Sequence, residues 1–218
     1  MTWFRAEFGD EPLRRPVITP TREFFPGPFI GDDEMRAVVD LVCSYADVDP
    51  GRVTVELYGD HGERELAAAT GLTYRSEAAA GHFRRENGRA VIAIDRTLGT
   101  TPVRLVATVA HELGHVRLLD EERVSPDRRD HEPLTDLLTV YLGLGIFTAN
   151  AAFEYTQTRE RRATNRLGYL PEPMFGYGLA CHASLRGERE PAWAAHLDTN
   201  PRTYLKRGLR FLAASPLR

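Results

Sequence analysis

Two histidines and a glutamate in this sequence stand at a spacing that suits a metal ion and a proton-transferring carboxylate. His111, Glu112 and His115 form an H-E-x-x-H pattern. On a helix, side chains four residues apart share one face, so both imidazoles can reach the same ion. Glu112 lies beside them, where it can take a proton from a metal-bound water and pass it to a leaving group. The pattern therefore predicts a zinc site with a general base on the same helix.

A second motif, D-H-E-P-L-T-D at 130–136, supplies acidic residues after a strongly charged turn. Catalytic zinc takes three protein ligands and keeps one position open for water. Glu132 is the predicted third ligand. Asp136 lies one helical turn later on the same face and is predicted to accept the second N–H of a liganding imidazole. His131 and Asp136 itself remain alternatives for the third ligand, because histidine and any carboxylate bind zinc well.

The elements that position these motifs are predicted to be helices. The first motif lies in an apolar stretch over 102–119, where Thr101 and Pro102 suit a helix start. This context favours a metal site over the simpler explanation, which is a polar patch on a helix that carries the pattern by chance. Further helices are expected at 131–150, 152–165, 173–186 and 201–214.

The N-terminal half is predicted to be mostly extended. Residues 1–32 are rich in Pro and Gly and are expected to form an extended lead-in segment. A helix is expected from Asp32 or Asp33 to Ala46, and strands at 52–58 and 90–95. A short helix at 64–69 and a strand within 71–83 are weaker expectations. The fold class is therefore α+β, with a small N-terminal sheet packed on a mainly helical C-terminal half in one domain, 1–218.

Composition and charge argue against nucleic acid and membrane as partners. The formal net charge of −3 indicates no nucleic-acid partner. No apolar run approaches the roughly 20 residues that span a bilayer, so no membrane partner is expected. The N-terminal residues lack the apolar core of a secretory signal, and Cys43 and Cys181 form no C-x-x-C pair. The expectation is a cytoplasmic protein with free thiols.

The combined motif His111-Glu112-x-x-His115 and Glu132-x-x-x-Asp136 resembles the gluzincin metallopeptidases over about residues 90–153. The resemblance implies a zincin-like fold and a peptide or protein substrate, with Glu132 completing the zinc site and Asp136 supporting a histidine. The chain also resembles an uncharacterised bacterial group of H-E-x-x-H proteins. Its His-Glu-Leu-Gly-His segment is similar to small cytoplasmic metallopeptidases that cleave transcriptional repressors and whose third ligand is a downstream Glu.

The gluzincin resemblance implies two further features. In that family an edge strand of the sheet binds extended peptide, and Ala90 to Asp95 is the expected counterpart. A Tyr or His from the C-terminal half usually stabilises the tetrahedral oxyanion. Tyr177 is the expected residue, with Tyr169 and His182 as alternatives.

These observations together predict a zinc-dependent hydrolase, and more narrowly a peptidase, in which Glu112 handles the protons. Two alternatives stay open: a catalytically silent, zinc-stabilised binding or scaffold protein, and a dedicated regulatory protease acting on one protein partner. The presence of Glu112, which zinc binding does not need, favours catalysis. A purely structural site usually fills its fourth position with protein.

Overall fold

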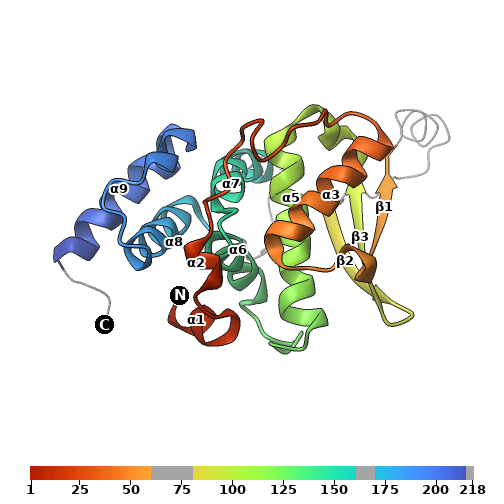
Figure 1. Ribbon diagram of the computed structural model, residues 1–218, viewed down its shortest axis with the longest axis horizontal. Helices are drawn as coiled ribbons and strands as arrows, with labels where there is room; N and C mark the ends of the chain where they lie inside the picture. The colour runs from red at the N-terminus through yellow and green to blue at the C-terminus, as the bar shows by residue number, and fades with distance from the viewer. Residues whose placement is uncertain (60–80, 161–169, 215–218) are drawn as a thin grey trace.

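The computed structural model describes residues 1–59, 81–160 and 170–214, which form a mixed α+β fold (Figure 1). The small sheet lies at one end of the molecule and helices α8 and α9 lie at the other (Figure 1). The elements in chain order are α1 (Thr2–Phe8), α2 (Glu11–Arg14), α3 (Asp32–Ala46), η1 (Pro50–Arg52), β1 (Val53–Tyr58), β2 (Gly81–Glu86), β3 (Arg89–Asp95), η2 (Arg96–Thr100), α5 (Pro102–His115), η3 (Val116–Asp120), α6 (His131–Tyr141), α7 (Gly145–Glu160), α8 (Glu172–Leu185), η4 (Ala192–His196) and α9 (Thr199–Ala214).

The sheet has the strand order β1-β3-β2 within the described part of the chain. The central strand β3 pairs parallel with β1 and antiparallel with β2. Asn87 and Gly88 join β2 to β3, and both have positive φ (50° and 76°), as a tight hairpin turn requires. Helix α5 packs against β2, β3 and α3. The sheet therefore supports the helix that carries the H-E-x-x-H motif.

The N-terminal segment differs from the extended lead-in that the sequence predicted, because it folds into α1 and α2. Phe4 is 1% exposed and stacks on Tyr141 of α6, with 5.5 Å between ring centroids. The hydroxyl of Tyr141 also donates a hydrogen bond to the carbonyl of Gly9. Pro and Gly content indicated a loop, but the burial of aromatic rings outweighs it. Residues 1–14 are therefore part of the packed structure.

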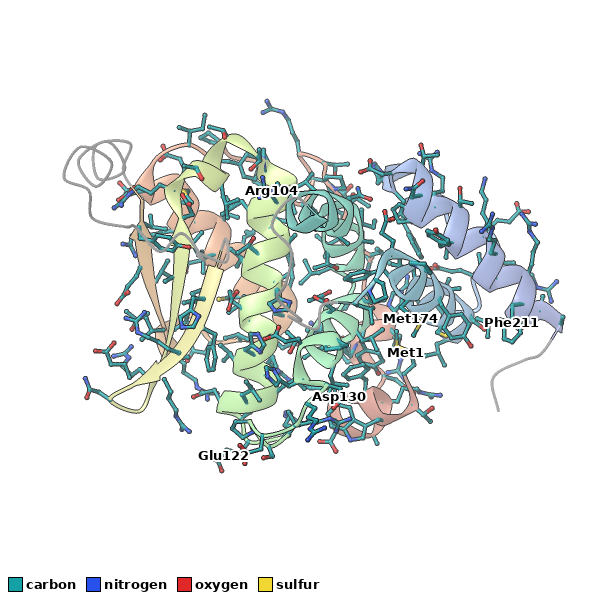
Figure 2. All side chains as sticks on the ribbon, turned by 180° about the vertical axis from the view of Figure 1, so that it is seen from behind. Met1, Arg104, Glu122, Asp130, Met174 and Phe211 are labelled. Carbon is teal, nitrogen blue, oxygen red and sulfur yellow. The ribbon has the colours of Figure 1, made fainter. Side chains whose placement is uncertain are left out.

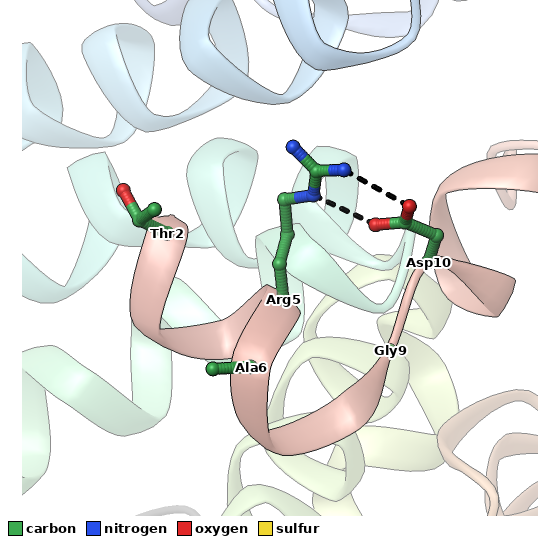
Figure 3. A pocket seen from close by; sticks show the side chains of 5 residues that line it. All are labelled: Thr2, Arg5, Ala6, Gly9 and Asp10. Carbon is green, nitrogen blue, oxygen red and sulfur yellow. Dashed lines mark hydrogen bonds and ion pairs between the residues drawn. The ribbon is translucent and has the colours of Figure 1, made fainter. Parts of the chain in front are cut away.

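Figure 3 shows a hollow at this N-terminal segment, lined by Thr2, Arg5, Ala6, Gly9 and Asp10. The guanidinium of Arg5 donates to both carboxylate oxygens of Asp10, at 2.7 and 2.9 Å. The two charged groups that line the hollow therefore neutralise one another, and we assign no function to it.

The helix expected over 131–150 is two helices, α6 and α7. Gly143 has φ 86°. Its N–H bonds to the carbonyl of Val140 at 3.1 Å, and the N–H of Leu144 bonds to the carbonyl of Thr139 at 2.9 Å. This pair of hydrogen bonds is the Schellman motif, which ends a helix at a left-handed glycine. The apolar periodicity continues through the break and hides it.

The other expected elements stand as follows. The expected helices at 102–119, 173–186 and 201–214 correspond to α5 with η3, α8, and α9, and η3 is one turn of π-helix. The expected helix at 152–165 is the second half of α7, whose described part ends at Glu160. The predicted helix at 64–69 and most of the strand expected within 71–83 lie outside the described residues. No described helix is long and apolar enough to span a bilayer.

Small residues allow α8 and α9 to pack closely. A Cβ added at Gly176 would lie 2.2 Å from Cβ of Tyr204 and 2.8 Å from its carbonyl carbon, and one added at Gly208 would lie 2.6 Å from Cβ of Ala180. Such contacts are far shorter than van der Waals distances, so these positions require glycine. In contrast, a Cβ at Gly178 would meet the end of the flexible Leu137 side chain at 3.0 Å.

We expect Gly176→Ala to destabilise the protein and Gly178→Ala to leave it unchanged or slightly stabilised. Helix propensity favours Ala over Gly by about 1 kcal/mol at both positions. At Gly176 the overlap with the Tyr204 backbone outweighs this gain, for a net loss of about 1–3 kcal/mol. Urea unfolding of both variants measures the difference. Equal stability of the two variants would show that α8 and α9 do not approach this closely.

Candidate metal centre

Helix α5 holds His111, Glu112 and His115 in a buried position, with exposed fractions of 7%, 5% and 7%. The remainder of the helix from Leu105 onward is also buried. Buried polar groups need partners, because water cannot compensate their polar atoms. The partners of the two histidines come from α6, which packs alongside α5 (Figure 1). Figure 2 shows Glu122 and Asp130 in the turn that joins the two helices.

The three residues that the sequence predicted as ligands lie together. Oε2 of Glu132 is 3.0 Å from Nε2 of His111 and 3.5 Å from Nε2 of His115. One potential ligand atom from each residue lies within 4.8 Å of the others. Two imidazole nitrogens and one carboxylate oxygen are a donor set typical of a catalytic zinc site. The cluster can therefore hold a metal ion.

Both imidazole rings are held in place by hydrogen bonds at Nδ1, on the side of the ring that faces away from the cluster. Nδ1 of His111 is 2.8 Å from Oδ1 of Asp136, and Nδ1 of His115 is 3.3 Å from Oγ1 of Thr135. The Thr135 hydroxyl donates its proton to the carbonyl of His131 at 2.8 Å, so it accepts from His115. Asp136 likewise accepts from His111. Each ring is thus N–H at Nδ1 and directs Nε2 toward the cluster, which is the arrangement that metal-binding histidines use.

Asp136 therefore lies where the sequence placed it, as the partner of a histidine. Its Oδ1 faces Nδ1 of His111, the side of the ring opposite the cluster, which argues against Asp136 as a ligand. Thr135 was missed by sequence reasoning. The one feature of the sequence that could have pointed to Thr135 is its place between Glu132 and Asp136. This feature is weak, because threonines within helices often donate to a backbone carbonyl of the preceding turn.

Hydrogen bonds within the cluster stabilise the charged forms of His111 and Glu132. Burial opposes the charged form of His111, but hydrogen bonds to Asp136 and Glu132 prevail and raise its pKa well above the ordinary value. Burial also opposes the charged form of Glu132, and the two histidines nevertheless lower its pKa. Burial lowers the pKa of His115. A proton on His111 thus lies where a cation would bind.

His131 lies beside this cluster but outside it. Its ring centroid is 5.8 Å from that of His115, and its Nδ1 is 3.6 Å from Oε1 of Glu132. Consecutive residues on a helix diverge by about 100°, so His131 and Glu132 do not direct their side chains to one point. The geometry favours Glu132 over His131 as the third ligand.

Glu112 lies next to the cluster, under the strand β2. Burial raises the pKa of Glu112 to about 7, while the positive charge of His111 and a hydrogen bond from the N–H of Phe83 act in the opposite direction. A Cβ at Gly81 would lie 2.9 Å from Oε1 of Glu112, so only glycine allows the strand to pass this close. The ring of Phe83 stacks on the imidazole of His115, with 5.8 Å between ring centroids.

The strand beside the site is therefore β2, which corrects the expectation for Ala90–Asp95. Those residues belong to β3, which is the central strand, whereas β2 lies at the outside of the described sheet. Sequence reasoning chose β3 because its continuous apolar residues give the strongest strand signal. Strong apolar character indicates a strand buried on both faces, and an outer strand is more polar.

Two of the oxyanion candidates, Tyr177 and His182, lie among the described residues and pack against aromatic rings of α9 and η4. The ring of Tyr177 packs edge-on against Phe211 of α9, with 6.2 Å between ring centroids, and none of its contacts among the described residues is with the cluster. His182 is 1% exposed and packs on Trp193, and burial lowers its pKa to about 3, so it is neutral at pH 7. Tyr169 lies outside the described residues. The structure thus gives no support to Tyr177 as a catalytic residue.

Comparison with known proteins returns no match to this chain among family models, curated proteins or solved structures. The interpretation of the site therefore rests on its geometry and chemistry.

We expect Glu132→Ala to abolish tight zinc binding and His131→Ala to have little effect, because Glu132 is the described residue that directs an oxygen at both imidazole Nε2 atoms. Asp136→Ala should weaken zinc affinity by about 10–100-fold, as loss of a histidine's partner typically does. Competition titrations with a zinc chelator rank the three variants. The assignment would be overturned if His131→Ala proved the most damaging.

Zinc affinity should fall as the pH falls. In the metal-free chain the pKa of His111 is raised, so its Nε2 still carries a proton that zinc must displace. Below that pKa, each pH unit should weaken binding by about tenfold for one proton released. Titrations at several pH values measure the slope, and a lightly buffered sample should acidify when zinc is added. An affinity independent of pH would contradict the protonated state of His111.

Proposed function

We propose that this protein is a zinc-dependent hydrolase of the gluzincin type that cleaves peptide bonds. The observation that carries the proposal is the convergence of His111 Nε2, His115 Nε2 and Glu132 Oε2, with the carboxylate of Glu112 beside them but not among them. Three protein donors leave a position open for water or substrate, which distinguishes a catalytic zinc site from a structural one.

The residues present fit zinc in both donor chemistry and orientation. Imidazole nitrogen and carboxylate oxygen are common zinc ligands, and hydrogen bonds to Asp136 and Thr135 hold the two rings in the required tautomer. When bound, zinc lowers the pKa of a coordinated water to about 7 and polarises a carbonyl. Glu132 and the two histidines would hold the ion.

Glu112 is suited to transfer protons in this site. The N–H of Phe83 holds its carboxylate, and burial raises its pKa to about 7 in the metal-free chain. A group that titrates near the working pH can both accept a proton and return it. A bound cation would favour the ionised carboxylate, which is the form that a general base needs. We assign Glu112 as the base that activates water and then protonates the leaving amine.

The strand β2 supports a peptide as the substrate. It lies at the outside of the described sheet, and Gly81 and Phe83 contact Glu112 and His115. An outer strand has backbone N–H and C=O groups that can pair with an extended polypeptide. A peptide added along β2 would bring its bonds next to the general base. The gluzincin resemblance implies the same substrate class.

The competing function is a catalytically silent zinc site in a binding or scaffold protein. Zinc binding alone does not explain why an ionisable group is buried at position 112, at 5% exposure, beside the ligands. A regulatory protease dedicated to one partner would use the same chemistry on a narrower substrate. Elemental analysis of the purified chain together with cleavage of an unbiased peptide library separates these three outcomes.

Replacing the base tests the catalytic assignment. We expect Glu112→Gln to retain zinc and to lose about 10²–10⁴-fold in cleavage rate, because the amide keeps the size of the side chain but cannot accept a proton. Glu23→Gln, the same change at an exposed site, is the matched control and should cleave at the parental rate. Zinc binding without cleavage by the parent, or parental activity in Glu112→Gln, would favour the silent site.

A further inference from the structure

The carboxylate of Asp136 has a second partner besides His111. Its Oδ1 accepts from Nδ1 of His111 at 2.8 Å, and its Oδ2 accepts from the backbone N–H of Leu170, also at 2.8 Å. Asp136 is 3% exposed, so water has little access to either oxygen. The two oxygens of one buried carboxylate thus connect helix α5 to the residue that precedes α8.

Both hydrogen bonds are needed to hold this carboxylate in one orientation. A buried carboxylate is stable only where donors compensate its charge. A single donor would leave the other oxygen unpartnered and the carboxylate free to rotate about its side-chain torsions. Because Asp136 orients the ring of His111, loss of the Leu170 donor would also loosen the position of Nε2.

The position of the Leu170 N–H depends on the packing of α8 and α9. The Leu170 side chain is 6% exposed and belongs to the apolar cluster that includes Phe175, Leu179 and Leu205. These three members of the cluster come from α8 and α9, and the cluster also includes Val140 of α6 and Ile146 of α7. The two helices in turn pack closely through Gly176 and Gly208. A displacement of the α8–α9 pair would therefore disturb the apolar cluster in which Leu170 is buried.

We propose that the backbone N–H of Leu170 is a positioning group for the metal site, and that it couples metal binding at His111 to the docking of α8 and α9. Such coupling is reciprocal: docking of the helices raises metal affinity, and metal binding stabilises the docked helices by the same factor. The inference deepens the proposed function and rests on it, because it requires a metal at His111. It makes the distal helices a place where a partner could regulate the site.

Two variants at position 170 isolate the N–H. Leu170→Ala and Leu170→Pro both lose the buried side chain, but only the proline also loses the donor. Pro171 already restricts residue 170 to extended backbone, which proline tolerates. In zinc titrations we expect Leu170→Pro to bind about 10–100-fold more weakly than Leu170→Ala. Equal affinities of two folded variants would overturn the proposal.

Hydrogen exchange tests the reverse direction in the unmodified chain, and it decides the question if Leu170→Pro does not fold. Zinc should slow exchange of the α8 amides by about 5–150-fold more than it slows exchange in α3, which lacks this connection. In Asp136→Ala at saturating zinc, the excess protection of α8 should vanish. The comparison with α3 removes the general stabilisation that any ligand confers.

The outcomes separate this inference from the proposed function. If the parent binds zinc and α8 and α3 gain equal protection, the coupling is wrong and the metal site stands. If the parent does not bind zinc at all, the proposed function fails and the coupling fails with it. Excess protection of α8 that survives in Asp136→Ala would also overturn the coupling through this carboxylate.

Discussion

The buried carboxylate of Asp136 is the interaction on which the rest of this structure depends. It receives one N–H from His111 on α5 and one from Leu170 before α8, while its own helix, α6, also carries Glu132. A charge at 3% exposure without donors would be strongly unfavourable. The two hydrogen bonds therefore tie α6 to α5 and to the segment before α8, and the packing of α5 on α6 brings His111, His115 and Glu132 together.

The pKa values in the cluster favour a positive charge on His111 beside a negative charge on Glu132. Hydrogen bonds to Asp136 and Glu132 raise the pKa of His111, and the neighbouring histidines lower the pKa of Glu132, in both cases against burial. A proton is thus held between the imidazole of His111 and the carboxylate of Glu132, and in the proposed zinc site the ion would replace it. Thr135 completes this arrangement, because its hydroxyl donates to the backbone of His131 and leaves a lone pair for His115.

The strand β2 packs against Glu112 and His115. The N–H of Phe83 holds Glu112, and the ring of Phe83 packs on His115. Gly81 allows the strand to approach the carboxylate, since a Cβ there would overlap with Thr108 at 2.4 Å. Burial under β2 also raises the pKa of Glu112 to about 7. In the proposed function, the strand that would align the peptide also contacts the proposed base, Glu112.

The sequence by itself determined which residues of the site share one face of a helix. Residues at i and i+4 share one face of a helix, so the grouping of His111 with His115 and of Glu132 with Asp136 could be predicted. Helices with a clear apolar stripe were predicted for the same reason, while the break at Gly143 was not, because one left-handed glycine does not interrupt that stripe. Only the tertiary structure placed Leu170 on Asp136, β2 on Glu112 and Tyr177 on Phe211. These contacts join residues far apart in the chain, and periodicity along one element carries no information about which distant element packs against it.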